Sequence, residues 1–132
     1  MSQENVEVVR RFYEAWARNA FPGPVELMDP EIEYVNPPGA IEPGTRRGRV
    51  AFSGAVEKLL EGWESWQADP EEFKAVGDQV VVVLRYRALG RGSGVEMEGR
   101  ESALWTLRDG RVTRYAWFHE PEDALEAAGL EE

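Results

Sequence analysis

The sequence predicts an α+β fold in which N-terminal helices pack on one face of a strongly curved, mixed but mostly antiparallel sheet. Residues 95–119 have the composition of two long strands joined at Asp109-Gly110. That dipeptide favours the left-handed backbone of a tight hairpin turn. Near the N-terminus, residues 6–16 instead place apolar side chains at steps of three and four, which is typical of a helix. Helices that precede a meander of strands bury their apolar faces by packing on the sheet.

The first half of the chain is predicted to form three helical segments and one strand. The first helix carries Val6, Val9, Phe12, Tyr13 and Trp16 on its apolar face. A short helical turn bracketed by prolines is expected within residues 22–30, followed by a strand at residues 31–35. A loop at residues 39–49, rich in Gly, Pro and Arg, leads into a third helix at about residues 48–66.

Four strands and a final short helix are predicted for the remainder. The strands are expected at residues 71–76, 79–89, 95–108 and 111–119, and the helix at residues 122–128. Two registers are open for the last hairpin. A two-residue turn places Trp105 opposite Arg114, whereas a bulge at Gly110 places Trp105, Tyr115, Trp117 and Glu101 on one face. We favour the bulge because it gathers the aromatic side chains on one surface.

Composition limits the classes of function. The 132 residues are 42% hydrophobic and 30% charged, as expected for one globular domain spanning residues 1–132. The net charge of −10 disfavours nucleic acids and anionic membrane surfaces as partners. With no cysteine and one histidine, disulfides, thiolate chemistry and a conventional zinc site are not expected, nor is any other cofactor. No apolar segment approaches the roughly 18 residues of a membrane span, so we expect a soluble cytoplasmic protein.

Several segments in their order resemble the nuclear transport factor 2-like superfamily, and within it the SnoaL-like (polyketide cyclase-like) group. They are NVEVVRRFYEAW, LMDPEIEYVNPP, GTRRGR, PEEF, GRGSGVE, WTLRDGRV and EDALEAAGL. The resemblance covers essentially the whole chain. It implies a cone-shaped fold with a pocket between helices and sheet, and a homodimer formed through the outer sheet face. It does not imply one reaction, because this fold carries many activities.

The resemblance also places known chemical positions on this sequence. Ketosteroid isomerase-like members use an aspartate at the end of the first strand, where this chain has Asn36, and a phenol at or beside Phe12. Many SnoaL-like sequences have a histidine where this chain has Ala103. An acid usually follows the fifth strand, and Glu120 matches it, preceded by His119. Because an amide does not accept a proton at neutral pH, isomerase chemistry at Asn36 is not expected.

Three candidate catalytic residues remain: Glu101, His119 and Glu120. Glu101 shares a mostly apolar strand face, where loss of hydration would raise the pKa of its carboxyl and suit it to acid–base work. The alternatives for Glu101 are an ion pair with Arg114 or Arg85, or exposure at the strand end. His119 and Glu120 either form an acid–base pair at the cone mouth or, for Glu120, simply complement the last helix.

Aromatic side chains supply the candidate ligand-binding residues, and the alternative is that they are ordinary core. The aromatic candidates are Tyr13, Trp16, Trp63, Trp66, Trp105, Tyr115 and Trp117, and Asn36 is added to this set from the resemblance. Arg46, Arg47 and Arg49 form either an anion site at a helix N-terminus or a solvated basic loop.

The sequence therefore predicts a domain that binds a small apolar or aromatic molecule, with acid–base catalysis (isomerisation, cyclisation or hydration) as the alternative. Whether it is an enzyme stays open. A third class is an assembly domain with a vestigial cavity. A homodimer is expected because Val81, Val83 and Leu89 put apolar surface on the sheet face that the helices do not cover.

Overall fold

The computed structural model describes residues 2–40 and 42–129, which form three α-helices, one 3₁₀ helix and six strands. In chain order these are α1 (Ser2–Ala17), η1 (Val25–Leu27), β1 (Met28–Asn36), β2 (Gly44–Arg47), α2 (Arg49–Glu61), β3 (Trp63–Val76), β4 (Gln79–Gly90), β5 (Glu96–Arg108), β6 (Arg111–Phe118) and α3 (Asp123–Ala127).

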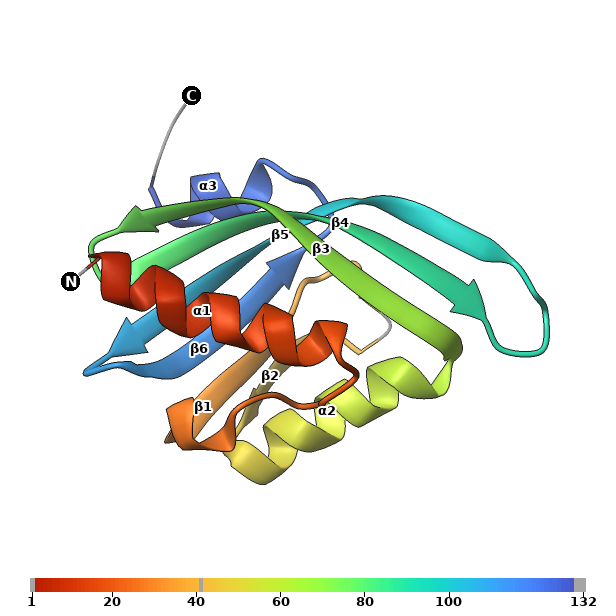
Figure 1. Ribbon diagram of the computed structural model, residues 1–132, viewed down its shortest axis with the longest axis horizontal. Helices are drawn as coiled ribbons and strands as arrows, with labels where there is room; N and C mark the ends of the chain where they lie inside the picture. Colours follow the sequence, from red (N-terminus) through yellow and green to blue (C-terminus); the bar gives the residue numbers. More distant parts are fainter. Residues whose placement is uncertain (1, 41, 130–132) are drawn as a thin grey trace.

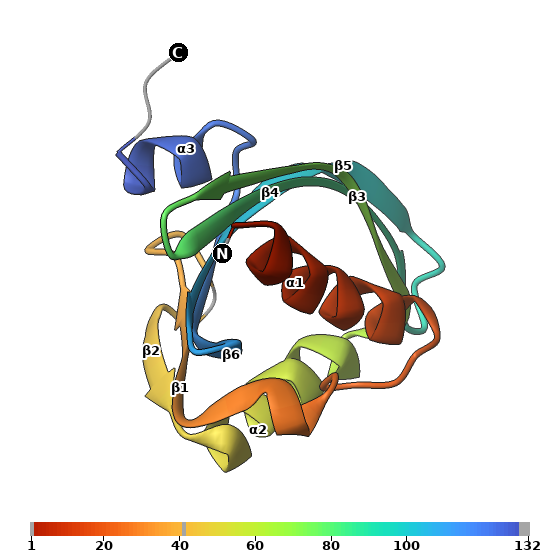
Figure 2. The same cartoon turned by 60° about the vertical axis from the view of Figure 1, so that its left-hand side comes forward.

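The six strands form one mixed sheet in the order β2-β1-β6-β5-β4-β3. All neighbours pair antiparallel except β1 and β6, which are parallel. The sheet curves around α1 and α2, which lie on its concave side, while α3 lies on the convex side (Figures 1 and 2). This confirms the predicted α+β architecture of helices on a curved, mostly antiparallel sheet.

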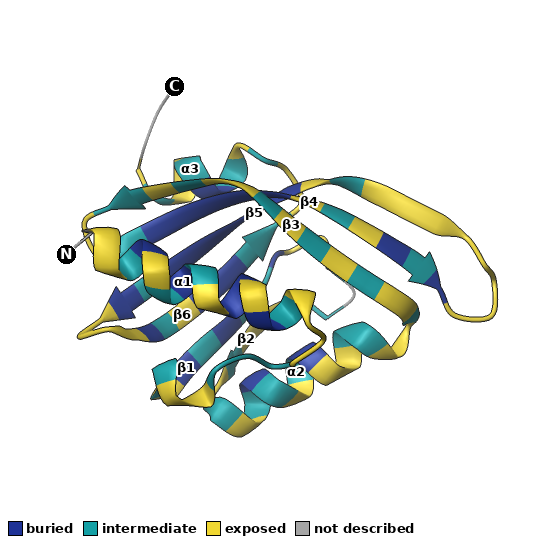
Figure 3. Cartoon of the chain, viewed as in Figure 1, coloured by how far each residue is buried: buried dark blue, intermediate teal, exposed yellow. Residues whose placement is uncertain are grey.

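The main core lies between the two long helices and the concave face of the sheet. Burial is concentrated along the central strands and on one side of α1 (Figure 3). Phe12 on α1, Phe52 on α2 and Trp105 on β5 are each fully buried. The helical spacing that predicted α1 thus corresponds to a buried stripe, since Val9 and Phe12 are fully buried and Tyr13 is 2% exposed.

Two segments differ from the prediction for the middle of the chain. The third helix ends at Glu61, so Trp63 and Trp66 lie on β3 and the Asp69-Pro70 pair lies inside that strand. Proline is tolerated there because β3 is an edge strand, and the pairing with β4 shifts register just after Pro70. Residues 44–47, expected to be loop, form the other edge strand, β2.

The last hairpin combines features of both expected registers. Asp109 and Gly110 form a two-residue turn, with φ of 53° and 78°, and Arg108 pairs with Arg111. The extra residue is Thr113, because Leu107 pairs with Val112 while Thr106 pairs with Arg114. The favoured bulge at Gly110 is therefore wrong in position. The expected gathering of aromatic side chains on one face is nevertheless present, because Trp105 pairs with Tyr115 and Trp117 lies two residues further along the same strand face.

The convex face of the sheet is partly covered by the chain's own C-terminal helix. Val81 and Leu104 form a small apolar cluster with Ala124 of α3. Ser102 anchors this helix, because its hydroxyl donates to the Glu120 carbonyl and accepts from the Ala124 amide. The apolar surface that motivated the homodimer prediction is thus reduced, since Val81 and Val83 are 1% and 6% exposed within one chain.

Candidate functional site

A cavity of about 60 Å³ lies between α1, α2 and the concave face of the sheet. Six predicted site residues line it: Tyr13, Trp16, Trp66, Glu101, Tyr115 and Trp117. The other lining residues are Phe21, Tyr34, Val56, Leu59, Ala68 and Leu84. Seven of the twelve are aromatic and Glu101 is the one carboxylic acid. No lysine, arginine or histidine lines this cavity among the residues that the structure describes.

The aromatic walls come from four different elements. Tyr13 and Trp16 project from α1, and their ring centroids lie 5.2 Å apart at 74°. Tyr115 on β6 lies 5.8 Å from Trp16 at 83° and 5.3 Å from Tyr34 on β1. Trp66 reaches the cavity from β3. Steep angles between neighbouring rings produce walls that meet at corners rather than a parallel stack.

A hydrogen bond or a ring contact fixes the orientation of each tryptophan described here. The indole N–H of Trp16 donates to the Pro22 carbonyl at 2.8 Å, and that of Trp105 donates to the Tyr13 hydroxyl at 3.1 Å. Trp66 stacks on Tyr86 with centroids 5.4 Å apart and the rings 10° from parallel. The indole N–H groups of Trp16 and Trp105 are therefore bound by acceptors of the protein itself, and Trp66 is held through one ring face.

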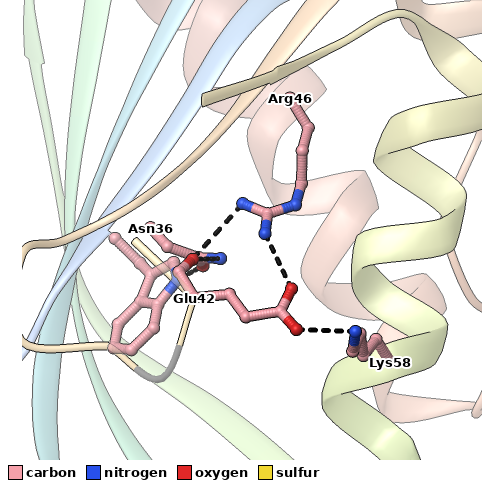
Figure 4. Close-up of polar contacts among 5 residues, drawn as sticks. Asn36, Glu42, Arg46 and Lys58 are labelled. Atoms are coloured by element: carbon pink, nitrogen blue, oxygen red, sulfur yellow. Dashed lines mark hydrogen bonds and ion pairs between the residues drawn. The ribbon is translucent and has the colours of Figure 1, made fainter. Parts of the chain in front are cut away.

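Asn36 holds Trp117, one of the lining residues, as part of a polar cluster at the end of β1. Its Oδ1 accepts the indole N–H of Trp117, and its Nδ2 donates to the Glu42 carbonyl at 2.9 Å. The Glu42 carboxylate in turn contacts Arg46 of β2 at 2.9 Å and Lys58 of α2 at 2.6 Å (Figure 4). Both ends of the amide are therefore used to hold Trp117 and the loop after β1.

Glu101 is the chemically unusual residue of the cavity. It is 9% exposed, and burial raises the pKa of its carboxyl to about 7. Across residues 2–40 and 42–129, no hydrogen bond or ion pair to this side chain is found. Glu101 lies opposite Leu84 in the β4–β5 ladder and faces the helices, while its neighbour Arg100 faces the other side.

The arginines expected as alternative partners of Glu101 have other partners. Arg85 contacts Glu71 at 3.5 Å and Glu98 at 4.0 Å. Arg114 contacts Glu33 at 3.7 Å. Both arginines are half-exposed on the convex side, so the alternation of the strands separates them from Glu101.

Three phenols surround the carboxyl. Burial raises the pKa of Tyr13, Tyr34 and Tyr115 above the usual tyrosine range, and the nearby charge of Glu101 adds to the increase for each of them. All three phenols therefore stay protonated at neutral pH. The Tyr13 hydroxyl already accepts from Trp105, while those of Tyr34 and Tyr115 can donate to a bound group.

Several predicted site residues lie outside the cavity lining. Trp105 is fully buried beneath Tyr13, and Asn36 meets Trp117 rather than the cavity. Trp63 sits at the start of β3, 6.3 Å from Trp66. His119 and Glu120 are exposed after β6, and the His119 ring packs edge-on against Trp117 at 4.9 Å. The two do not form a pair in the cavity, because the chain turns away toward α3 after Phe118.

The basic cluster is used internally. Arg46 pairs with Glu42, Arg47 contacts Glu33 at 2.7 Å, and the Arg49 guanidinium donates to the Met28 carbonyl at 2.6 and 3.1 Å. The basic cluster is therefore neither a free anion site nor a fully solvated loop. In the described part of the chain, no group of three acidic or histidine side chains is placed to hold a metal ion.

Trp66 is a predicted aromatic candidate that does line the cavity, although it does so from β3 and not from the predicted helix. From the sequence, no role in the cavity is assigned to Tyr34, Leu59 and Phe21. Tyr34 was accessible to reasoning, since it alternates with Ile32 and Asn36 on a strand whose inner face is apolar. Leu59 follows the apolar period of α2 with Phe52 and Val56, whereas Phe21 carries no local signal and is brought to the cavity by tertiary packing alone.

Comparison with known proteins identifies the family. A family model described as a SnoaL-like domain matches residues 9–115. The chain belongs to the SnoaL-like family. Its fold is nuclear transport factor 2-like, as the resemblance in the sequence implied. Among curated proteins, none matches this SnoaL-like sequence significantly.

Similar solved structures share the fold at low sequence identity. An NTF2-like protein of unknown function from Burkholderia pseudomallei is 21% identical, with a TM-score of 0.80 over 93% of this chain and 95% of that chain. TerC, co-crystallised with polyporic acid, is 23% identical, with a TM-score of 0.79 over 96% and 98%. A hypothetical protein with a ketosteroid isomerase-like fold from Catenulispora acidiphila, in complex with trimethylamine, is 22% identical, with a TM-score of 0.73 over 95% and 94%. In the part of this SnoaL-like chain that the structure describes, no helix is long and apolar enough to cross a membrane.

Proposed function

We propose that this SnoaL-like protein binds a small, mostly apolar or aromatic molecule in the cavity, with one polar group of that molecule placed against Glu101. The observation that carries the proposal is a buried carboxyl without a partner in an otherwise aromatic cavity. No fully enclosed side-chain oxygen in the described residues lacks a partner, so the carboxyl oxygens of Glu101 are open to the cavity, where a polar group of a ligand can reach them. That two similar structures contain small organic molecules is in accord with this use of the fold.

The chemistry of the walls favours this class of ligand over phosphorylated molecules. No cationic side chain lines the cavity in the described residues, and the net charge of −10 repels anions. The indole N–H groups of Trp16 and Trp117 are not free to hold an anion, because they donate to Pro22 and Asn36.

Tryptophan fluorescence tests the proposal directly, because three tryptophans line the cavity. Neutral aromatic compounds that carry one polar group should quench or shift the emission in a saturable way. Trp63→Phe, which changes a tryptophan outside the lining, should leave the affinity unchanged, whereas Trp66→Leu should reduce it. Tight binding of nucleotides without any response to the aromatic panel would contradict the proposal.

Acid–base catalysis is the second candidate, and the same carboxyl supports it. A glutamate with a pKa of about 7 is poised to take or give a proton at neutral pH, and it meets no arginine that would hold it ionised. Its role would be that of the proton carrier, with the phenols of Tyr34 and Tyr115 as hydrogen-bond donors to a developing oxyanion. If a substrate is found that the protein turns over, Glu101→Gln should lower kcat by about 100-fold or more. Activity that survives this change would exclude Glu101 as the proton carrier.

A homodimer through the convex sheet face remains part of the proposal. The surface beside α3 is charged, since Glu71 bridges Arg100 at 2.9 Å and Arg85 at 3.5 Å. An interface there would be mixed polar and apolar, and its stability would depend on salt.

A further inference from the structure

We propose that the polar group which this cavity selects is a compact alkylated ammonium, so that its ligands are small organic cations. This inference rests on the proposed function and names its ligand class. An aromatic box with one acidic side chain is the arrangement that recognises alkylammonium groups, because ring faces attract a cation that is too poorly hydrated to need hydrogen bonds.

The walls present ring faces at suitable separations. Tyr13, Trp16 and Tyr115 are neighbours with centroids 5.2 and 5.8 Å apart, and their planes are steeply inclined. A cation in the corner between such rings lies within about 6 Å of more than one centroid, which is the range of cation–π attraction. Trp66 adds a further wall, fixed by its stacking on Tyr86.

The polar groups of the cavity include no cationic side chain among the described residues, so an anionic ligand finds no counter-charge there. The indole N–H groups of Trp16 and Trp117 are engaged outside it. The other polar groups of the lining are the Glu101 carboxyl, the Trp66 indole N–H and the hydroxyls of Tyr13, Tyr34 and Tyr115. A quaternary ammonium needs no acceptor in hydrogen-bonding geometry, only a negative charge and polarisable surface, and the cavity supplies both.

The size of the cavity points to a compact head group. At about 60 Å³ it is well below the roughly 300–1,000 Å³ of pockets for drug-sized ligands. A trimethylammonium group is nearly spherical and suits such a space. Part of the lining is formed by half-buried Trp16, Trp66 and Trp117. The remainder of a longer ligand can therefore extend into solvent between these side chains.

Glu101 and its surroundings give the inference a distinctive pH dependence. A cation binds the ionised carboxylate, so affinity should rise as pH increases through about 7 and then level off. A neutral carbonyl ligand binds the protonated carboxyl, so its affinity should fall over the same range. The other titratable groups facing Glu101 are Tyr13 from α1, Tyr34 from β1 and Tyr115 from β6, all protonated here. The Arg46 charge also reaches Tyr34 from β2.

The experiment compares choline with 3,3-dimethylbutan-1-ol, its uncharged analogue of nearly the same shape, by calorimetric titration of the full chain at pH 6 and pH 8. We expect choline to bind at least about tenfold more tightly at pH 8, and this preference to shrink at pH 6. Glu101→Gln should abolish most of the preference. Trp66→Leu should weaken choline binding, while the matched Trp63→Leu should not.

The outcomes separate the two proposals. Equal binding of both compounds, or tighter binding of the uncharged one, would overturn the cation inference and leave the proposed function intact. Choline affinity that is unchanged in both Glu101→Gln and Trp66→Leu would also overturn it, since binding would then lie elsewhere. If neither compound binds, the cation inference fails, and the response to neutral aromatic compounds decides the proposed function separately.

Discussion

Replacing Glu101 by glutamine should change the pH dependence of stability in a direction that the structure fixes. The carboxyl titrates near pH 7 in the folded chain and near its ordinary value of 4.5 when unfolded. Between these values the folded state binds more protons than the unfolded state, so the free energy of unfolding falls as pH rises. Glutamine occupies nearly the same space and does not titrate.

The size of the effect follows from the two pKa values. The carboxyl ionises at lower pH in the unfolded chain than in the folded chain. Relative to a group that does not titrate, this lowers the free energy of unfolding by about 1 kcal/mol at pH 5 and about 3 kcal/mol at pH 8. The advantage of Glu101→Gln over the wild type should therefore grow by about 2 kcal/mol between these two pH values. The phenols of Tyr13, Tyr34 and Tyr115 do not contribute, because burial keeps them protonated over this range.

Urea unfolding at pH 5 and pH 8 measures this difference. Glu96→Gln, a change of an exposed glutamate at the start of the same strand, is the matched control and should follow the wild type at both pH values. If Glu101→Gln also follows the wild type, the carboxyl is hydrated or paired in solution. The proposed role of Glu101 would then lose its physical basis.

Three other predictions test the surroundings of the cavity. Tyr13→Phe should lower the free energy of unfolding by about 1–3 kcal/mol, because it leaves the buried Trp105 indole N–H without its acceptor; a loss that persists undiminished in a Trp105→Phe background would contradict this reason. Asn36→Asp should cost about 1–3 kcal/mol in urea unfolding, because it replaces the donor to the Glu42 carbonyl by an oxygen, and neither wild type nor variant should isomerise a conjugated enone beyond a trace. Robust wild-type enone turnover that survives Glu101→Gln and His119→Gln would place an active site elsewhere. Sedimentation at micromolar concentration should give twice the 14.9 kDa mass of one chain, and only the monomer mass would refute the homodimer.

The order of helices and strands was predictable because local patterns carry it. The apolar period of α1, the Asp109-Gly110 turn and the two long runs around it each report on a few neighbouring residues. The errors arose where tertiary pairing overrides local preference. The residues after Gly62 continue a helical pattern, yet pairing with β4 makes them strand, and four residues with loop composition become β2 by pairing with β1.

The candidate site, like the fold, was only partly predictable from the sequence. The sequence by itself determined which side chains were available: Glu101 as a carboxyl on an apolar strand face, aromatic residues on α1 and β6, and no cysteine. Only the tertiary structure decided which of these meet. A bulge at Thr113 brings Tyr115 opposite Trp105, and a strand in place of a helix directs Trp66 to the cavity. Strand alternation turns Arg85 and Arg114 away from Glu101, and the exit of the chain toward α3 removes His119. Such choices depend on pairing between residues distant in sequence, and no local pattern encodes them.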